Sequence, residues 1–147
     1  MSRYLKVGGI LSLVFLMGVF LVQCTPPGGD PEFVGKWTVT ITTSIVATVT
    51  WTLTSTTLHC FIDAGASGTA TLDANVSGVD ETLKHLIVTY TSITNTGGFV
   101  AYENPADFFY ALYARSGDTL TIEGNTKNVA TFPTAFSSSA LTFTKVP

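Results

Sequence analysis

The sequence has few cysteines, few histidines and few basic residues. Two cysteines and two histidines among 147 residues leave no disulfide framework and no closely spaced set of zinc ligands. Seven lysines and arginines stand against ten acids and form no cluster, which excludes the basic face that nucleic-acid binding requires. The longest apolar run, residues 7–22, is shorter than the roughly twenty residues that a membrane-spanning helix needs.

That run has the pattern of a secretory signal, because a basic head precedes a short apolar centre. The residues Leu21, Val22, Gln23 and Cys24 resemble the lipobox of bacterial lipoproteins. The resemblance implies that residues 1–23 are removed and that Cys24 is acylated. Several acyl chains hold a protein far more firmly than one. We therefore expect a lipid-anchored protein of the bacterial cell envelope, in the outer membrane or at the surface. The alternative is an uncleaved signal anchor in which the cysteine is incidental.

Residues 24–32 read as a lipidated flexible tether. Prolines and glycines dominate this stretch, and it contains no large apolar residue that could dock. The folded domain is expected to begin near Phe33 and to occupy residues 33–147. Its length suits a single domain.

The domain is rich in threonine that alternates with apolar residues. In the stretches 37–42 and 45–54 every second residue is apolar, which gives each predicted strand one apolar and one hydroxylated face. Similar stretches recur up to residue 146, and short segments rich in turn-forming residues separate them. Consecutive strands with short turns predict an antiparallel meander, either a closed barrel or a sandwich.

Residues 105–116 are ambiguous. Asn104, Pro105, Asp107 and Gly117 could begin and end a helix. The aromatic residues 108–110 and Tyr113 favour a strand instead, and the following turn residues suggest a hairpin. We favour the strand.

The first predicted strand opens with Gly35, Lys36 and Trp37, which resemble the G-x-W motif of lipocalins. The last strands are similar to the closing strands of small bacterial lipocalin-like proteins. The resemblance implies an all-β fold, an antiparallel up-and-down β-barrel of about eight strands. It also implies that Trp37 closes the base of the barrel and that a basic side chain lies across its ring. Lys145 is the residue expected in that role, with Arg115 second.

An eight-stranded barrel is either filled by side chains or holds one small ligand. We expect inward-facing apolar side chains to bind a small hydrophobic ligand such as a fatty acid or lipid fragment. The alternative is a surface lipoprotein with a filled barrel that contacts other proteins through loops such as residues 95–107, which carry Phe99 and Tyr102. The expected ligand-binding residues are Val49, Trp51, Leu53, Leu72, Val88, Tyr90, Tyr110 and Ile122.

Catalytic chemistry has little support in the sequence. His59 and Cys60 are neighbours in a predicted strand, so their side chains point to opposite faces and cannot form a nucleophile–base pair. No histidine or cysteine pair has zinc-ligand spacing, and no phosphate-binding loop occurs. We therefore expect neither an enzyme nor a cofactor.

Overall fold

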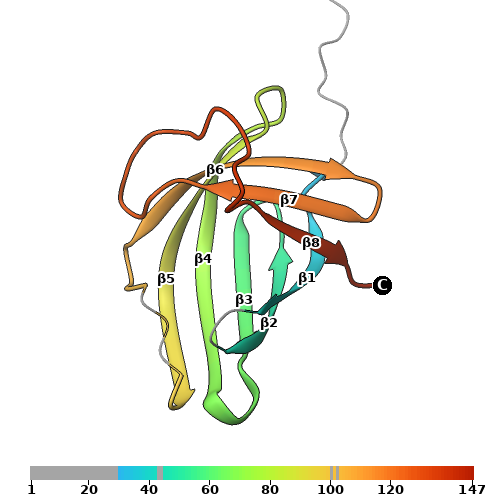
Figure 1. The fold of residues 1–147 in the computed structure, drawn as a ribbon. Helices are drawn as coiled ribbons and strands as arrows, with labels where there is room; N and C mark the ends of the chain where they lie inside the picture. The colour runs from blue at the N-terminus through green and yellow to red at the C-terminus, as the bar shows by residue number, and fades with distance from the viewer. Residues whose placement is uncertain (1–29, 43–44, 100, 102) are drawn as a thin grey trace, which may run out of the picture.

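The computed structural model describes residues 30–42, 45–99, 101 and 103–147, so Cys24 and the predicted signal lie outside the described residues. Eight antiparallel strands form one closed barrel, which confirms the predicted all-β up-and-down barrel (Figure 1). A 3-10 turn, η1 (Gly65–Ser67), precedes the fourth strand. The strands are β1 (Gly35–Thr42), β2 (Val46–Leu53), β3 (Thr57–Asp63), β4 (Gly68–Asp80), β5 (His85–Gly97), β6 (Phe108–Ser116), β7 (Thr119–Gly124) and β8 (Leu141–Lys145).

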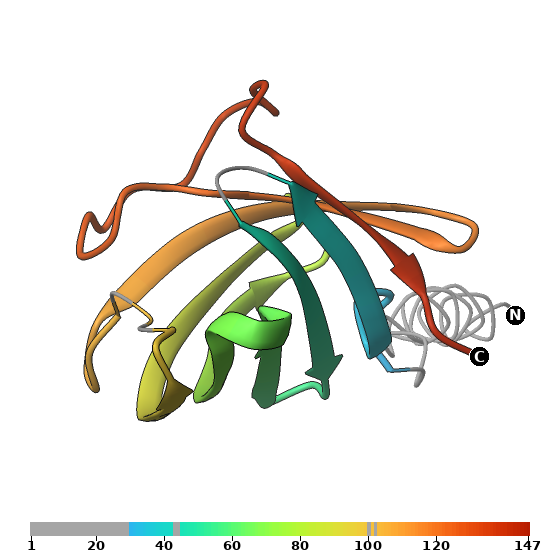
Figure 2. The ribbon, with the colours of Figure 1, turned by 60° about the horizontal axis from the view of Figure 1, so that its bottom comes forward.

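The buried and exposed faces of the strands follow the alternating pattern of the sequence, as predicted. In β2 the apolar residues Ala47, Val49, Trp51 and Leu53 are buried, while the intervening residues are exposed or half-buried. The buried side chains of all strands meet in one core. The strands curve around this shared interior (Figure 2). In the part of the chain that is described, no helix has the length and hydropathy needed to cross a membrane.

Residues 108–116 form a strand, as favoured. Asn104 and Asp107 do not cap a helix: the backbone N–H of Asn104 donates to the Asp107 carboxylate at 2.8 Å, and the Asp107 N–H donates to the Asn104 carbonyl at 3.0 Å. This closed turn lets the chain enter β6 directly. The strand then pairs with β5 on one side and β7 on the other.

The two ends of the barrel differ. The end that contains Trp37 and the turn after β4 is called the closed end, because large buried side chains fill it. The other end, called the open end, contains the turn between β3 and β4 and the long segments 98–107 and 125–140. The bulkiest fully buried side chains all lie towards the closed end, where they fill the interior: Phe33, Trp37, Leu53, Leu58, Leu86, Val88, Tyr113, Leu120 and Phe143.

Trp37 is buried at the closed end of the barrel. Its side chain is 0% exposed, and its indole N–H donates to the carbonyl of Phe33 at 2.8 Å. Phe33 packs edge-on against Tyr113, with 5.2 Å between ring centroids. Gly35 has a φ of 145°, and a Cβ there would lie 3.4 Å from the Trp37 indole nitrogen. Glycine suits this position because side chains disfavour such a φ and the indole packs closely over it.

The expectation that Lys145 lies across the Trp37 ring is wrong. Arg115, the second choice, holds that position, with its Cζ 5.5 Å from the ring centroid. Lys145 is paired with Trp37 in register but stays exposed. Arginine suits the position because its planar guanidinium can stack on a ring while still donating hydrogen bonds. Arg115 donates to the carbonyls of Glu32 and Gly117, each at 3.0 Å.

Glu32, placed by sequence at the end of the tether, is held by the barrel. Its carbonyl accepts the bond from Arg115, and its carboxylate pairs with Lys84 at 2.8 Å. The Lys84 ammonium also lies 5.8 Å from the centre of the Tyr113 ring. Ordered contacts with the closed end therefore begin at or before Glu32.

Candidate functional site

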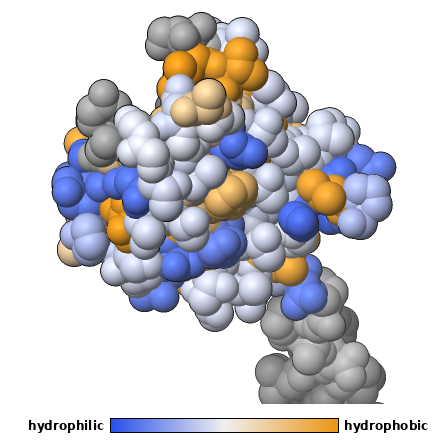
Figure 3. All heavy atoms as spheres, turned by 90° about the horizontal axis from the view of Figure 1, so that it is seen from below, coloured by the Kyte–Doolittle hydropathy of each residue, from blue (hydrophilic) through white to orange (hydrophobic). Residues whose placement is uncertain are grey.

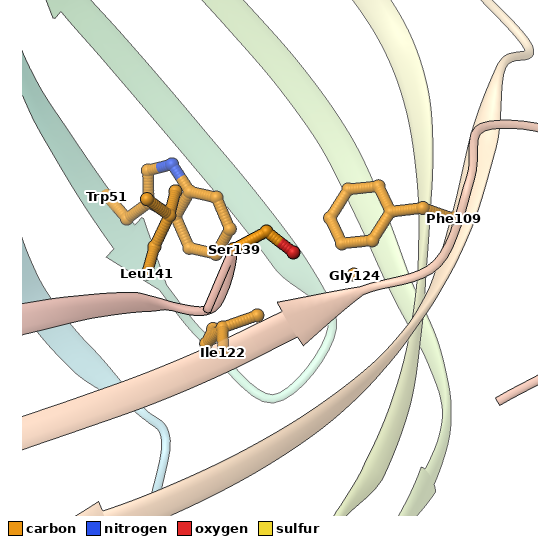
Figure 4. Close-up of a pocket in the computed structure, with 6 residues that line it drawn as sticks. All are labelled: Trp51, Phe109, Ile122, Gly124, Ser139 and Leu141. Carbon is orange, nitrogen blue, oxygen red and sulfur yellow. The ribbon is translucent and has the colours of Figure 1, made fainter. Parts of the chain in front are cut away.

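An apolar recess of about 210 Å³ lies in the half of the barrel towards the open end. Trp51 and Phe109 face each other across it, and the Ser139 hydroxyl lies between them (Figure 4). The inner faces of β2 and β4 carry small residues in this half, Ala47 and Ala70, whereas large side chains fill the closed half. The recess is lined by Trp51 of β2, Phe109 of β6, Ile122 and Gly124 of β7, Leu141 of β8 and Ser139 of the preceding segment.

Aromatic contacts fix the walls of the recess. Trp51 packs on Phe143, with 4.7 Å between ring centroids, so its indole rests on the filled closed half. The ring centroids of Phe109 and Tyr90 are 6.0 Å apart. Gly124 gives Phe109 its space, because a Cβ at this position would lie 3.2 Å from Cδ2 of the phenyl ring.

Most of the side chains expected to bind a ligand face the interior. Trp51 and Ile122 line the recess. Val49, Leu53, Leu72 and Val88 are buried in the core, and Tyr90 is half-buried against it. The structure therefore brings seven of the eight together inside the barrel.

Tyr110 is the exception, since it lies on the outer face. Ala111 and Tyr113 are buried inside, so strand alternation directs Phe109 inward and Tyr110 outward. Outside, the Tyr110 ring packs on Phe132, with 4.6 Å between centroids, and the Phe132 ring in turn stacks on His85 at 4.1 Å. Sequence reasoning missed Phe109 because three consecutive aromatic residues hide which face of the strand is buried.

One wall of the recess belongs to the segment 125–140, which Glu123 holds in place. The Glu123 side chain is 8% exposed, and its carboxylate accepts the Ser137 N–H at 2.8 Å and the hydroxyls of Ser137 and Ser139. These bonds, first from the backbone N–H of Ser137 and then from its hydroxyl, lower the pKa of Glu123. The charged carboxylate therefore fixes Ser139 beside the recess.

Asp107 joins the segment before β6 to the segment after β7, in the way that Glu123 holds Ser137 and Ser139. Asp107 accepts bonds from the Asn128 amide at 2.8 Å and from the Lys127 ammonium at 3.0 Å. The Asn128 bond, the Lys127 contact and the Asn104 backbone bond, in that order, lower the pKa of Asp107. Glu123 and Asp107 together hold both ends of the segment 125–140.

The groups considered for chemistry are separated. His59 faces outward and pairs with Asp73 at 2.6 Å, whereas Cys60 is buried inside, which confirms that they point to opposite faces. Burial raises the pKa of the Cys60 thiol to about 12, although a bond from the Trp51 side chain partly opposes this. Such a thiol is a poor nucleophile. Among the residues described, no group of three histidine, cysteine or acidic side chains could hold a metal ion.

Seen from the open end, hydrophobic side chains form separate patches among hydrophilic ones (Figure 3). Val46, 61% exposed, lies at this end beside β1. Phe99, which the interaction-module alternative requires on the surface, is instead half-buried against the core, and Tyr102 lies outside the described residues. The described part of residues 95–107 therefore presents less aromatic surface than the sequence suggested.

Comparisons with protein-family models, with curated proteins and with solved structures found no match to this chain. The strand pairing establishes an eight-stranded antiparallel barrel, and the comparisons identify no family for it. Its function has to be inferred from the residues of the recess.

Proposed function

We propose that this protein binds a small hydrophobic ligand in the recess between Trp51 and Phe109. The observation that carries the proposal is an apolar, aromatic-walled space of about 210 Å³ beside a core of fully buried side chains. Ligand sites are typically concave and lined by apolar and aromatic side chains with a few polar groups. Ser139 is the polar group of this lining.

The size of the recess limits the ligand. An apolar cavity of about 150 Å³ accommodates benzene. A recess of about 210 Å³ therefore suits one aromatic ring or a short alkyl segment. Below it, Leu53, Leu120 and Phe143 are almost completely buried, so the closed half has no room for a longer chain without rearrangement. A small ring or the end of a lipid fits better than a whole fatty acid.

The proposal includes a lipocalin-like assignment and a membrane anchor. Support for the first comes from Gly35 and Trp37, which occupy the base of the barrel with Arg115 across the indole. Support for the second comes from the lipobox-like sequence that ends at Cys24. The described chain starts at the closed end, so an anchored barrel would point its open end away from the bilayer, at the bacterial outer membrane or cell surface.

A matched pair of variants tests ligand binding in the full-length protein, reconstituted in nanodiscs. Benzyl alcohol serves as the probe, and ligand-observed NMR reports its binding. Trp51→Ala removes one wall and should weaken binding. Phe61→Ala removes an exposed aromatic ring from the outer face of β3 and should leave binding unchanged. Absence of saturable binding, or equal loss in both variants, would contradict the proposal.

A further inference from the structure

The Ser139 hydroxyl adjoins both the recess and a carboxylate. It lies between the rings of Trp51 and Phe109, among the groups that line the recess (Figure 4). Its Oγ donates to Oε1 of Glu123 at 3.2 Å and is also 2.6 Å from Oγ of Ser137. One hydroxyl group therefore connects the apolar space to a polar cluster beside it.

The Glu123 carboxylate acts only as an acceptor in this cluster. It is charged at neutral pH, because its pKa is lowered, mainly by the backbone bond from Ser137, and an ionised carboxylate has no proton to donate. The N–H and the hydroxyl of Ser137 donate to it at 2.8 and 2.9 Å. Its neighbours in β7, Ile122 and Gly124, line the recess, so strand alternation turns Glu123 to the opposite face. The carboxylate therefore attracts hydroxyl protons away from the recess.

The proton of Ser139 is used inside the cluster. A serine hydroxyl has one proton and two lone pairs. The Ser139 proton is donated to Glu123 or to the Ser137 oxygen. If Ser137 donates to Ser139 instead, the Ser139 proton still binds Glu123 and one lone pair of Ser139 stays unused. A proton turned into the recess would give up a bond to a charged acceptor, which is among the stronger kinds of hydrogen bond. Ser139 therefore presents a lone pair to the recess.

The rest of the described lining adds no donor between the two aromatic rings. The side chains of Phe109, Ile122 and Leu141 are hydrocarbon. Trp51 carries an N–H, but this nitrogen lies on the side of the indole away from Phe109 (Figure 4). A ligand oxygen that only accepts would meet the lone pair of Ser139 and stay unpaired among apolar groups. An unpaired polar group in such surroundings weakens binding.

We propose that the ligand is an apolar molecule with a hydrogen-bond donor, such as an alcohol or a phenol, and that this donor binds Oγ of Ser139 while the apolar part fills the recess. This inference rests on the proposed function and names the ligand class for the same site. It replaces the fatty acid that the sequence suggested, because a carboxylate has no proton to donate. The bond from Ser139 to Glu123 strengthens Ser139 as an acceptor, since linked hydrogen bonds polarise one another.

Two isomers that contain the same atoms test this preference: benzyl alcohol can donate a hydrogen bond, whereas anisole can only accept one. Each is titrated into the full-length protein in nanodiscs, with the NMR signal of the Trp51 indole N–H as the readout and the Trp37 signal as reference. The measured quantity is the ratio of the two dissociation constants, anisole over benzyl alcohol. Partition of the probes into the lipid is the same for every variant, so it cancels when the ratios of two variants are compared.

Three variants assign the preference to the hydroxyl. Ser139→Ala removes the acceptor and should lower the ratio about tenfold, the upper range for one hydrogen bond. Ser139→Thr keeps a hydroxyl and should retain the ratio, whatever its added methyl group does to both constants together. Ser138→Ala changes an exposed serine of the same segment that does not line the recess, and it should leave both constants unchanged.

The outcomes separate this inference from the proposed function. Saturable binding of both probes with the same ratio in the wild type and in Ser139→Ala overturns the donor preference and leaves the ligand site standing. A ratio that falls as far in Ser139→Thr as in Ser139→Ala overturns the role of the hydroxyl. Failure of both probes to shift the Trp51 signal overturns both proposals.

Discussion

The guanidinium of Arg115 lies over the indole of Trp37, 5.5 Å from the ring centroid, and it also ties the entering chain to the barrel through the Glu32 carbonyl. One side chain thus covers the base and fixes the position at which the chain reaches it. Lys145, opposite Trp37 in the sheet, makes neither of these contacts.

Arg115→Met should destabilise the fold by about 1–2 kcal/mol, because it removes a cation–π contact and hydrogen bonds to two carbonyls. Urea denaturation followed by tryptophan fluorescence measures the change. Lys145→Met is the matched control and should stay within about 0.5 kcal/mol of the wild type. An equal loss from both variants would argue against the stacking role.

Glu123 should make the segment 125–140 sensitive to acid. The folded-state pKa of Glu123 is lowered by its bonds from Ser137 and Ser139. Its stabilising contribution is therefore complete above the ordinary glutamate pKa and disappears as the pH falls through the lower folded value. Glu123→Gln should cost stability near neutral pH, and this deficit should shrink in acid. Glu81→Gln, in the exposed turn after β4, should show no such trend. A loss of stability in Glu123→Gln that stays constant with pH would contradict the role of the Glu123 carboxylate in holding the segment 125–140.

Gly124→Val should fill the recess without disturbing the fold. The new side chain would project towards Phe109, whose ring must shift by a few tenths of an ångström to admit it. We expect the affinity for benzyl alcohol to fall at least about tenfold while the free energy of unfolding changes by about 1 kcal/mol or less. Thr121→Val, on the outer face of the same strand, should preserve binding. Unchanged affinity in Gly124→Val would place the ligand elsewhere.

An anchor at Cys24 should hold the closed end near the membrane. The seven peptide units from Cys24 to Pro31 span at most about 25 Å. The thirteen residues of β4, at the tilt usual for barrels, rise about 33 Å, so the tether is too short to turn the open end onto the bilayer. A fluorophore at Leu83→Cys should be quenched by headgroup quenchers more than one at Val46→Cys, since these exposed sites lie at opposite ends. Equal quenching would contradict the anchored orientation.

The fold was predictable because it depends on local alternation. In β1 and β2 the period-two pattern of threonine and apolar residues assigns each face of the strand without any tertiary information. Trp37 falls on the apolar face of the same pattern, and its side chain is buried.

The recess was only partly predictable because its remaining lining depends on tertiary contacts. The residues 108–110 are all aromatic, so only the burial of Ala111 and Tyr113 shows that Phe109 faces inward. Ser139 reaches the recess because Glu123 binds the segment that carries it, and no local pattern encodes that contact. Arg115 replaces Lys145 for a similar reason, since one of its partner carbonyls, that of Glu32, comes from a distant part of the chain.

The central claim is that an apolar ligand enters the recess beside Trp51, and a crystal soaked with bromobenzene tests it most directly. The account predicts an anomalous bromine peak between Trp51 and Phe109, and no such peak in Gly124→Val. Bromine that binds only on the outer surface, or a wild-type recess that remains without it at saturating bromobenzene, would contradict the claim.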